Sequence, residues 1–202
     1  MRKELDYFYI DGAYGGVQDW FSDYWMKLGG CAAVTACDCS IYFSLFSNKK
    51  LYPFDQKNIS KKDYINFSKI MKPYLRPRIS GIDRLSIYLE GFRKYLVDKG
   101  EESLKLDPWS GENRLETTKN VIKHQLENNF PIPYLLLKHR DKEFDDYTWH
   151  WFLITGYEEL EDSFLVKVVT YGSACWLNFD KLWDTQYSKK GGFIIFRDGM
   201  KE

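Results

Sequence analysis

In the first two-thirds of the chain, apolar residues recur at the three- and four-residue spacing of an amphipathic helix. The segment 60–75 opens with Ser60, a residue type that caps helices, and prolines stop it at its end, which predicts a helix. The segment 80–100 repeats this pattern and ends at Gly100, and the segment 112–130 predicts one more helix. The supporting apolar residues are Tyr64, Phe67, Ile70, Met71, Ile82, Leu85, Leu89, Phe92, Leu96, Leu115, Val121, Ile122 and Leu126.

In the last third, the period changes to alternation and short apolar runs. Strands are predicted in 131–139, 147–157, 162–172, 173–179 and 191–197, with a helical turn at 180–184. Segregation of helices from strands is typical of the α+β class with an antiparallel sheet. We therefore expect one domain over 1–202, with a helical part at about 1–130 and a strand-rich part at about 131–202.

The segment from Cys31 to about Phe46 is apolar nearly all round. A helix of that kind is predicted to be buried. Gly29 and Gly30 separate it from the preceding segment, so the helix is expected to begin at or next to Cys31.

The composition narrows the range of functions. The chain of 202 residues has 29 basic and 29 acidic residues, and this zero net charge does not favour nucleic-acid binding. No stretch resembles a secretory signal or a membrane span, which favours a cytoplasmic protein. Four cysteines, three of them within nine residues, are not typical of a disulfide framework. The oligomeric state is left open.

Cys31 is the first candidate for chemistry. A thiol at a helix N-terminus lies at the positive end of the helix dipole, which stabilises its thiolate. The free N–H groups of the first turn can donate to an oxyanion. The alternative is that Cys31 is a small core residue.

The other cysteines are interpreted as structural. Cys37 and Cys39 lie deeper in the helix, and their spacing from Cys31 and from Cys175 fits neither a zinc site nor a redox pair. We expect Cys37 and Cys39 to pack in the core. No metal or other cofactor is predicted.

A nucleophilic thiol requires a base, and the chain has three histidines. His124 is expected on a helix surface, and His139 is expected to be exposed at a strand end among charged residues. His150 lies between two tryptophans at the start of an apolar strand, where the aromatic side chains would exclude water. A hydrogen-bonded core histidine is the alternative there.

These motifs together resemble a known superfamily. The order "GGVQDW…GGCAAVTAC" and then "HWFLITGY" resembles the papain-like cysteine peptidases, and most closely the bacterial C39-like group related to double-glycine leader peptidases. The segment "IKHQLENNFPIPYLLLKH" resembles the helix and strand that precede the histidine strand in that family. The resemblance implies a papain-like fold, with a buried N-terminal helix carrying Cys31 packed on a C-terminal antiparallel sheet.

The resemblance also implies roles for individual residues. Cys31 would be the nucleophile, His150 the general base and then acid, and Gln18 a side-chain donor to the oxyanion beside the backbone N–H of Cys31. Gln18 lies thirteen positions before Cys31, so the chain between them has to fold back. A polar loop residue is the alternative reading of Gln18.

The third catalytic position departs from the family. An Asp or Asn usually follows the histidine strand there, whereas Thr170 is the nearest match by position here, with Asn178 and Asp180 further on. The implied function is a thiol hydrolase acting on a peptide or other amide through an acyl-thioester. A catalytically silent binding module for a peptide or small partner, and an acyltransferase using the same residues, are the alternatives.

Overall fold

The computed structural model describes residues 1–78 and 81–199, so Ser80, the first residue of the predicted helical segment 80–100, lies outside them. Its helices and its antiparallel sheet confirm the α+β prediction. The helices are α1 (Tyr24–Gly29), α2 (Cys31–Phe46), α3 (Lys61–Met71), α4 (Leu85–Asp98), α5 (Leu115–Glu127) and α6 (Phe179–Trp183), with short 3-10 helices η1 (Gln18–Trp20) and η2 (Lys142–Tyr147).

A seven-stranded sheet runs in the order β4-β9-β5-β6-β7-β8, and β1 pairs with the second half of β6. Every pair in it is antiparallel. Its strands are β1 (Arg2–Glu4), β4 (Leu104–Ser110), β5 (Ile132–Leu136), β6 (His150–Glu159), β7 (Phe164–Thr170), β8 (Ser173–Asn178) and β9 (Gly192–Asp198). A separate hairpin joins β2 (Tyr9–Ile10) to β3 (Ala13–Tyr14).

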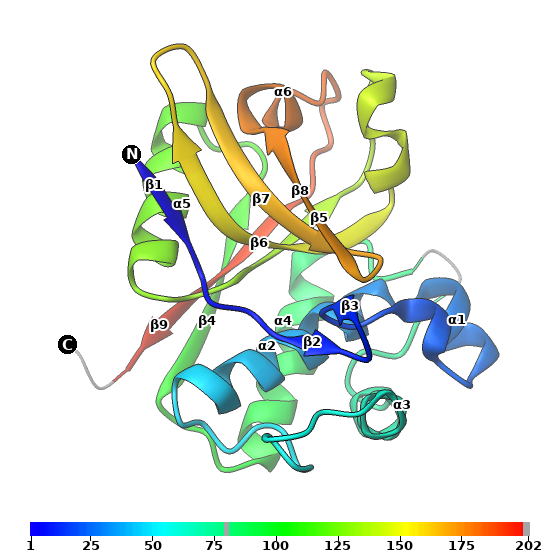
Figure 1. Cartoon of the computed structure of the whole chain (residues 1–202). Helices are drawn as coiled ribbons and strands as arrows, with labels where there is room; N and C mark the ends of the chain where they lie inside the picture. The colour runs from blue at the N-terminus through cyan, green and yellow to red at the C-terminus, as the bar shows by residue number, and fades with distance from the viewer. Residues whose placement is uncertain (79–80, 200–202) are drawn as a thin grey trace.

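The predicted division into a helical and a strand-rich part at about residue 130 is wrong in one respect. Both β1 and β4 belong to the first part of the chain and yet join the sheet (Figure 1). β4 carries Pro108, which is tolerated because β4 is an edge strand that pairs only with β9. Buried side chains from both parts form one hydrophobic cluster.

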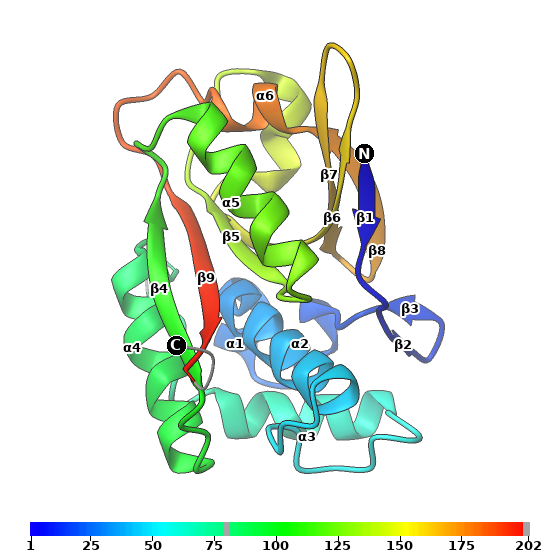
Figure 2. The same cartoon turned by 90° about the vertical axis from the view of Figure 1, so that its left-hand side faces the viewer.

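The predicted helices form where local signals place them. The side-chain oxygen of Ser60 caps α3 by accepting from the Asp63 N–H at 3.1 Å. Gly100 follows α4 with a positive φ of 68°. Figure 2 shows α5 lying beside β5 and β6, with α2 and α3 beneath the sheet and α4 next to β4.

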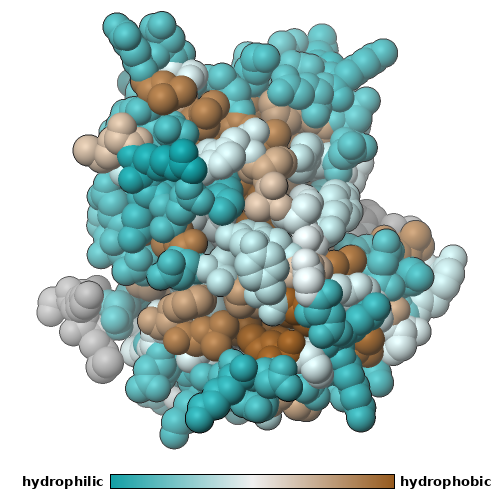
Figure 3. All heavy atoms as spheres, viewed as in Figure 1, coloured by the Kyte–Doolittle hydropathy of each residue, from teal (hydrophilic) through white to brown (hydrophobic). Residues whose placement is uncertain are grey.

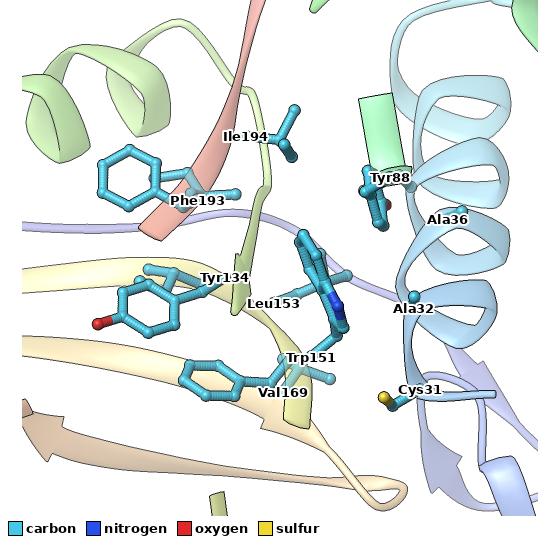
Figure 4. Close-up of a cluster of buried hydrophobic side chains, with 14 of the residues drawn as sticks. Cys31, Ala32, Ala36, Tyr88, Tyr134, Trp151, Leu153, Val169, Phe193 and Ile194 are labelled. Atoms are coloured by element: carbon cyan, nitrogen blue, oxygen red, sulfur yellow. The ribbon is translucent and has the colours of Figure 1, made fainter. Parts of the chain in front are cut away.

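α2 begins at Cys31 and is buried along most of its length, as predicted. Ala32, Ala33, Cys37 and Cys39 have no exposed surface, which confirms the packing assignment of the two inner cysteines. Trp151 of β6 fills the space between helix and sheet. Its ring stacks on Tyr88 of α4 at 4.4 Å, close to Ala32 and Ala36 (Figure 4).

The outer end of α2 reaches the surface. Phe46 is 44% exposed and Leu45 is partly buried. Figure 3 shows apolar atoms gathered on this face over α2. Within the described residues, none of the helices has the length and apolar character needed to cross a bilayer.

Asp38 is a buried acid in the middle of α2 that the sequence pattern did not single out. It accepts hydrogen bonds from the Tyr7 hydroxyl at 2.9 Å, the Tyr64 hydroxyl at 2.8 Å and the Gly16 N–H at 3.1 Å. Burial raises the pKa of Asp38 to about 6, although its three donors oppose the shift. One carboxyl group thus ties the N-terminal segment and α3 to α2.

We expect this carboxyl group to make stability depend on pH. Its folded-state pKa of about 6 is above the ordinary 3.8, so the folded chain binds the proton more tightly. Its contribution is present below about pH 4 and is lost as pH rises through about 6. Relative to Asp38→Asn, the wild type should lose about 2–3 kcal/mol of unfolding free energy between about pH 4 and pH 7.

Urea unfolding of both proteins at several pH values measures this difference. Comparing the two cancels the contributions of other titrating groups. A difference that does not change with pH would show that Asp38 stays ionised throughout.

Candidate active site

One cavity of about 560 Å³ brings together three residues selected from the sequence, Gln18, Cys31 and His150. They come from η1, from the first residue of α2 and from the first residue of β6. Gln18 and His150 are 132 positions apart in the chain, so the fold alone makes them neighbours of the thiol. The predicted folding back of residues 19–30 is provided by α1.

Cys31 is only 7% exposed, and its side chain points from the start of α2 toward the sheet beside Trp151 (Figure 4). Burial raises the pKa of the thiol. The backbone N–H groups of Trp151, Ala32 and Cys31 act in the opposite direction by hydrogen bonding to the sulfur. The thiol is therefore neutral at rest, with donors already arranged for a developing negative charge.

The first turn of α2 has no side-chain cap. Gly30 is its N-cap residue and has no side chain to donate or accept. A Cβ atom at Gly30 would overlap the carbonyl of Met26 in α1, so only glycine allows α1 to end directly against α2. The N–H groups around Cys31 are consequently left for the sulfur or for a ligand.

His150 lies 8% exposed at the start of β6. Its Nε2 is 2.6 Å from the Thr170 hydroxyl oxygen at the end of β7. With Nε2 engaged in this way, Nδ1 is the ring nitrogen left for the thiol proton. Within the described chain, His150 makes no direct hydrogen bond to Cys31.

Burial lowers the pKa of His150 to about 4, and no charged partner offsets this effect. The imidazole is therefore neutral at pH 7 and free to accept a proton. Since the folded-state pKa lies below the ordinary 6.5, protonation destabilises the fold as pH falls from about 6.5 toward 4. At rest the site holds a neutral thiol and a neutral imidazole.

Two aromatic residues beside the site have an unusual backbone. Trp149 precedes His150, Tyr171 follows Thr170, and each has a φ of +52°. Left-handed backbone is costly for bulky residues and persists where the surrounding structure enforces it. The Tyr171 ring stacks on the imidazole at 4.7 Å with the two planes 6° apart, and its hydroxyl donates to the Asp146 carbonyl.

Gln18 points its amide toward the residues that precede Cys31. Its Nε2 donates to the Lys27 carbonyl at 2.8 Å, which uses one of the two amide hydrogens. The other hydrogen remains for a ligand in the cavity that Gln18 lines. The arrangement is compatible with the oxyanion-donor role that the resemblance implies.

Of the three candidates for the orienting residue, the structure places only Thr170 against His150. Asn178 instead caps α6 by accepting from the Lys181 N–H, and Asp180 accepts from the Phe164 N–H and pairs with Lys119. A hydroxyl group can hold the ring in place but does not compensate an imidazolium charge.

The remaining histidines and cysteines lie away from this cavity. His124 is exposed, as predicted. The prediction that His139 is exposed is wrong: it is 8% exposed because its ring packs on Phe144, accepts from the Asp141 N–H and contacts the Lys181 carbonyl. Cys175 is exposed beside the Tyr147 hydroxyl.

Sequence reasoning missed the parts of the site that depend on the tertiary structure. No local sequence pattern predicts that Tyr171 stacks on His150 or that the Trp151 backbone lies near the thiol. The only available signal is that Tyr171 follows Thr170 and Trp151 follows His150 in the chain. Among the described residues, no group of three or more His, Cys, Asp and Glu could hold a metal ion. No family model, curated protein or solved structure matches the chain.

Substitution at Thr170 should change the pKa of His150. In Thr170→Asp, a carboxylate beside Nε2 stabilises the imidazolium, so the pKa should rise by about 1–2 units from its depressed value. Thr170→Val removes the acceptor and should not raise it. NMR titration of the imidazole resonances measures the shift.

Thr148→Val is the matched control, because Thr148 lines the same cavity but its hydroxyl donates to the Asp145 carbonyl. Equal pKa values for His150 in Thr170→Asp and Thr170→Val would contradict the contact between His150 Nε2 and the side chain at position 170.

Proposed function

We propose that the chain is a cysteine hydrolase that cleaves a peptide or other amide bond through an acyl-thioester, on a papain-like fold of the C39-like kind. The observation that carries the proposal is the shared cavity: a thiol at a helix N-terminus, an imidazole with one nitrogen held by Thr170, and a side-chain amide. Positive φ at two bulky residues beside this cavity supports it.

The first half of the reaction forms a thioester. His150 Nδ1 takes the proton of the Cys31 thiol while the sulfur attacks the carbonyl carbon of the amide. The resulting tetrahedral intermediate collapses by breaking its C–N bond, and the leaving amine takes the proton from the imidazolium. In the second half, water attacks the thioester carbon and gives its proton to His150. The acid is released and the thiol regains its proton.

The oxyanion of both steps would be stabilised by the free amide hydrogen of Gln18 and by N–H groups at the start of α2. Removing one such donor typically slows the chemical step about 100- to 1000-fold. Tyr171 would keep the imidazole plane fixed by stacking on it.

The main alternative is a papain-like binding module without turnover. It is supported by the neutral resting pair and by the absence of a carboxylate partner for the His150 ring in the described chain. Acyl transfer to an amine is a further alternative that uses the same residues, since an amine can replace water in the second half of the reaction.

Selective alkylation tests whether Cys31 and His150 form a functional pair. Cys175 is exposed and would react with iodoacetamide because of its exposure alone, so the experiment uses a Cys175→Ser background. We expect limiting iodoacetamide to label Cys31 before Cys37 and Cys39, which are fully buried. His150→Gln should slow this labelling about ten-fold or more.

Peptide mass spectrometry identifies the labelled cysteine, and His124→Gln, which changes an exposed histidine, is the control. Labelling of Cys37 or Cys39 as fast as Cys31, without pH dependence below about pH 8, would rule out the pair.

An activated ester tests the acyl intermediate. With p-nitrophenyl acetate, we expect a burst of one nitrophenol per protein chain and acetyl attached at Cys31. Hydrolysis predicts decay of the acetyl-protein in water alone, whereas transfer predicts decay only after glycinamide is added. No burst from wild-type protein, or an equal burst from Cys31→Ala in the Cys175→Ser background, would favour the binding module.

A further inference from the structure

A second cavity adjoins the one at Cys31. A cavity of about 440 Å³ shares Trp25, Pro77, Arg78 and Ile82 with the first. A Cβ atom placed on Gly29 would lie 3.3 Å from the Cβ of Pro77, so this wall passes close to the start of α2. The two cavities therefore adjoin each other, and we call the pair the extended cleft; its lining runs from the thiol to residues 73–78.

The wall of the extended cleft is anchored to the site strand. The indole Nε1 of Trp151 donates to the Ile82 carbonyl at 2.6 Å. Trp151 is next to His150 and its backbone N–H acts to lower the pKa of the Cys31 thiol, so one residue connects these two side chains with the cleft wall. A ligand held along this wall would be positioned relative to Cys31.

The charge lining the extended cleft is mainly positive. Arg76 lines the second cavity, Arg78 lines both, and both side chains are exposed. Among the described residues, neither arginine has a carboxylate within ion-pair distance. The one acidic lining residue, Asp83, lies beside Arg84 at 3.7 Å. Two guanidinium groups are thus left for an anionic ligand.

The mouth near the thiol is apolar instead. Trp25, Leu28, Trp149 and Tyr171 line the first cavity and are each more than half exposed. They come from α1 and from the two segments that flank His150 and Thr170. Large exposed apolar side chains around a concave site mark a binding surface.

We propose that the extended cleft binds an acidic peptide, and this proposal rests on the proposed function. Apolar side chains next to the scissile amide contact the aromatic mouth, and carboxylates further along the peptide pair with Arg76 and Arg78. The spatial order of aromatic mouth and basic wall then selects peptides in which an apolar residue and an acidic pair are separated by a fixed distance.

Binding is measured with Cys31→Ala, so that turnover does not contribute. The probes are fluorescein-labelled octapeptides of alanine with one phenylalanine, in which a Glu-Glu pair is moved along the chain and compared with Gln-Gln at the same place. Fluorescence anisotropy should show about ten-fold tighter binding for one Glu-Glu position than for its Gln-Gln partner. Raising the salt concentration should reduce the difference.

Arg76→Gln/Arg78→Gln should remove this preference while leaving the Gln-Gln peptides unaffected. The control is Lys62→Gln/Lys94→Gln, which loses the same charge from exposed positions on α3 and α4 that line neither cavity. We expect the control to keep the preference.

Equal binding of Glu-Glu and Gln-Gln peptides, a preference that survives the arginine variant, or no binding of any probe would overturn the proposal. These outcomes concern peptide affinity alone. Failure of the proposed function would be seen instead in the alkylation of Cys31 and in the ester burst. Binding with no reactivity at Cys31 would leave an acidic-peptide binding module.

Discussion

The buried contact between the start of α2 and the start of β6 is the constraint on which the candidate site depends. Trp151 ties this contact to the surrounding structure: its ring stacks on Tyr88 of α4, its indole N–H donates to the Ile82 carbonyl, and its backbone N–H acts to lower the pKa of the Cys31 thiol at the start of α2. His150 directly precedes it and is carried into the same cavity. Cys31, His150 and the cleft wall therefore meet around one buried residue of the core.

Burial at this contact works both for and against the proposed chemistry. It raises the pKa of the Cys31 thiol and lowers that of His150 to about 4, so a thiolate–imidazolium pair is disfavoured at rest. The same low-dielectric surroundings strengthen each donor that faces a developing charge. A substrate that displaces water and brings its carbonyl to these donors would shift the balance toward proton transfer only when it is bound.

Much of this could be predicted from local signals. The Gly29-Gly30 pair located the start of α2, strand alternation located β5 to β9, and counting along the strand after His150 reached Thr170. The features that were not predicted share a cause. The pairing of β1 and of β4 with other strands and the burial of His139 all depend on contacts with segments that are distant in the chain. Asp38 was overlooked because helical periodicity does not reveal which distant hydroxyls reach a helix.

The hydrogen bonds of Asp38 also hold the segment that leads to Gln18. Asp38 accepts from the Gly16 N–H, two residues before Gln18, and it lies seven residues after Cys31, where α2 begins. A side chain at Gly16 would overlap the Tyr64 ring. The positions of Gln18 and Cys31 are thus both fixed relative to α2. The relative position of Gln18 and Cys31 therefore depends in part on a buried carboxyl group that does not line the cavity.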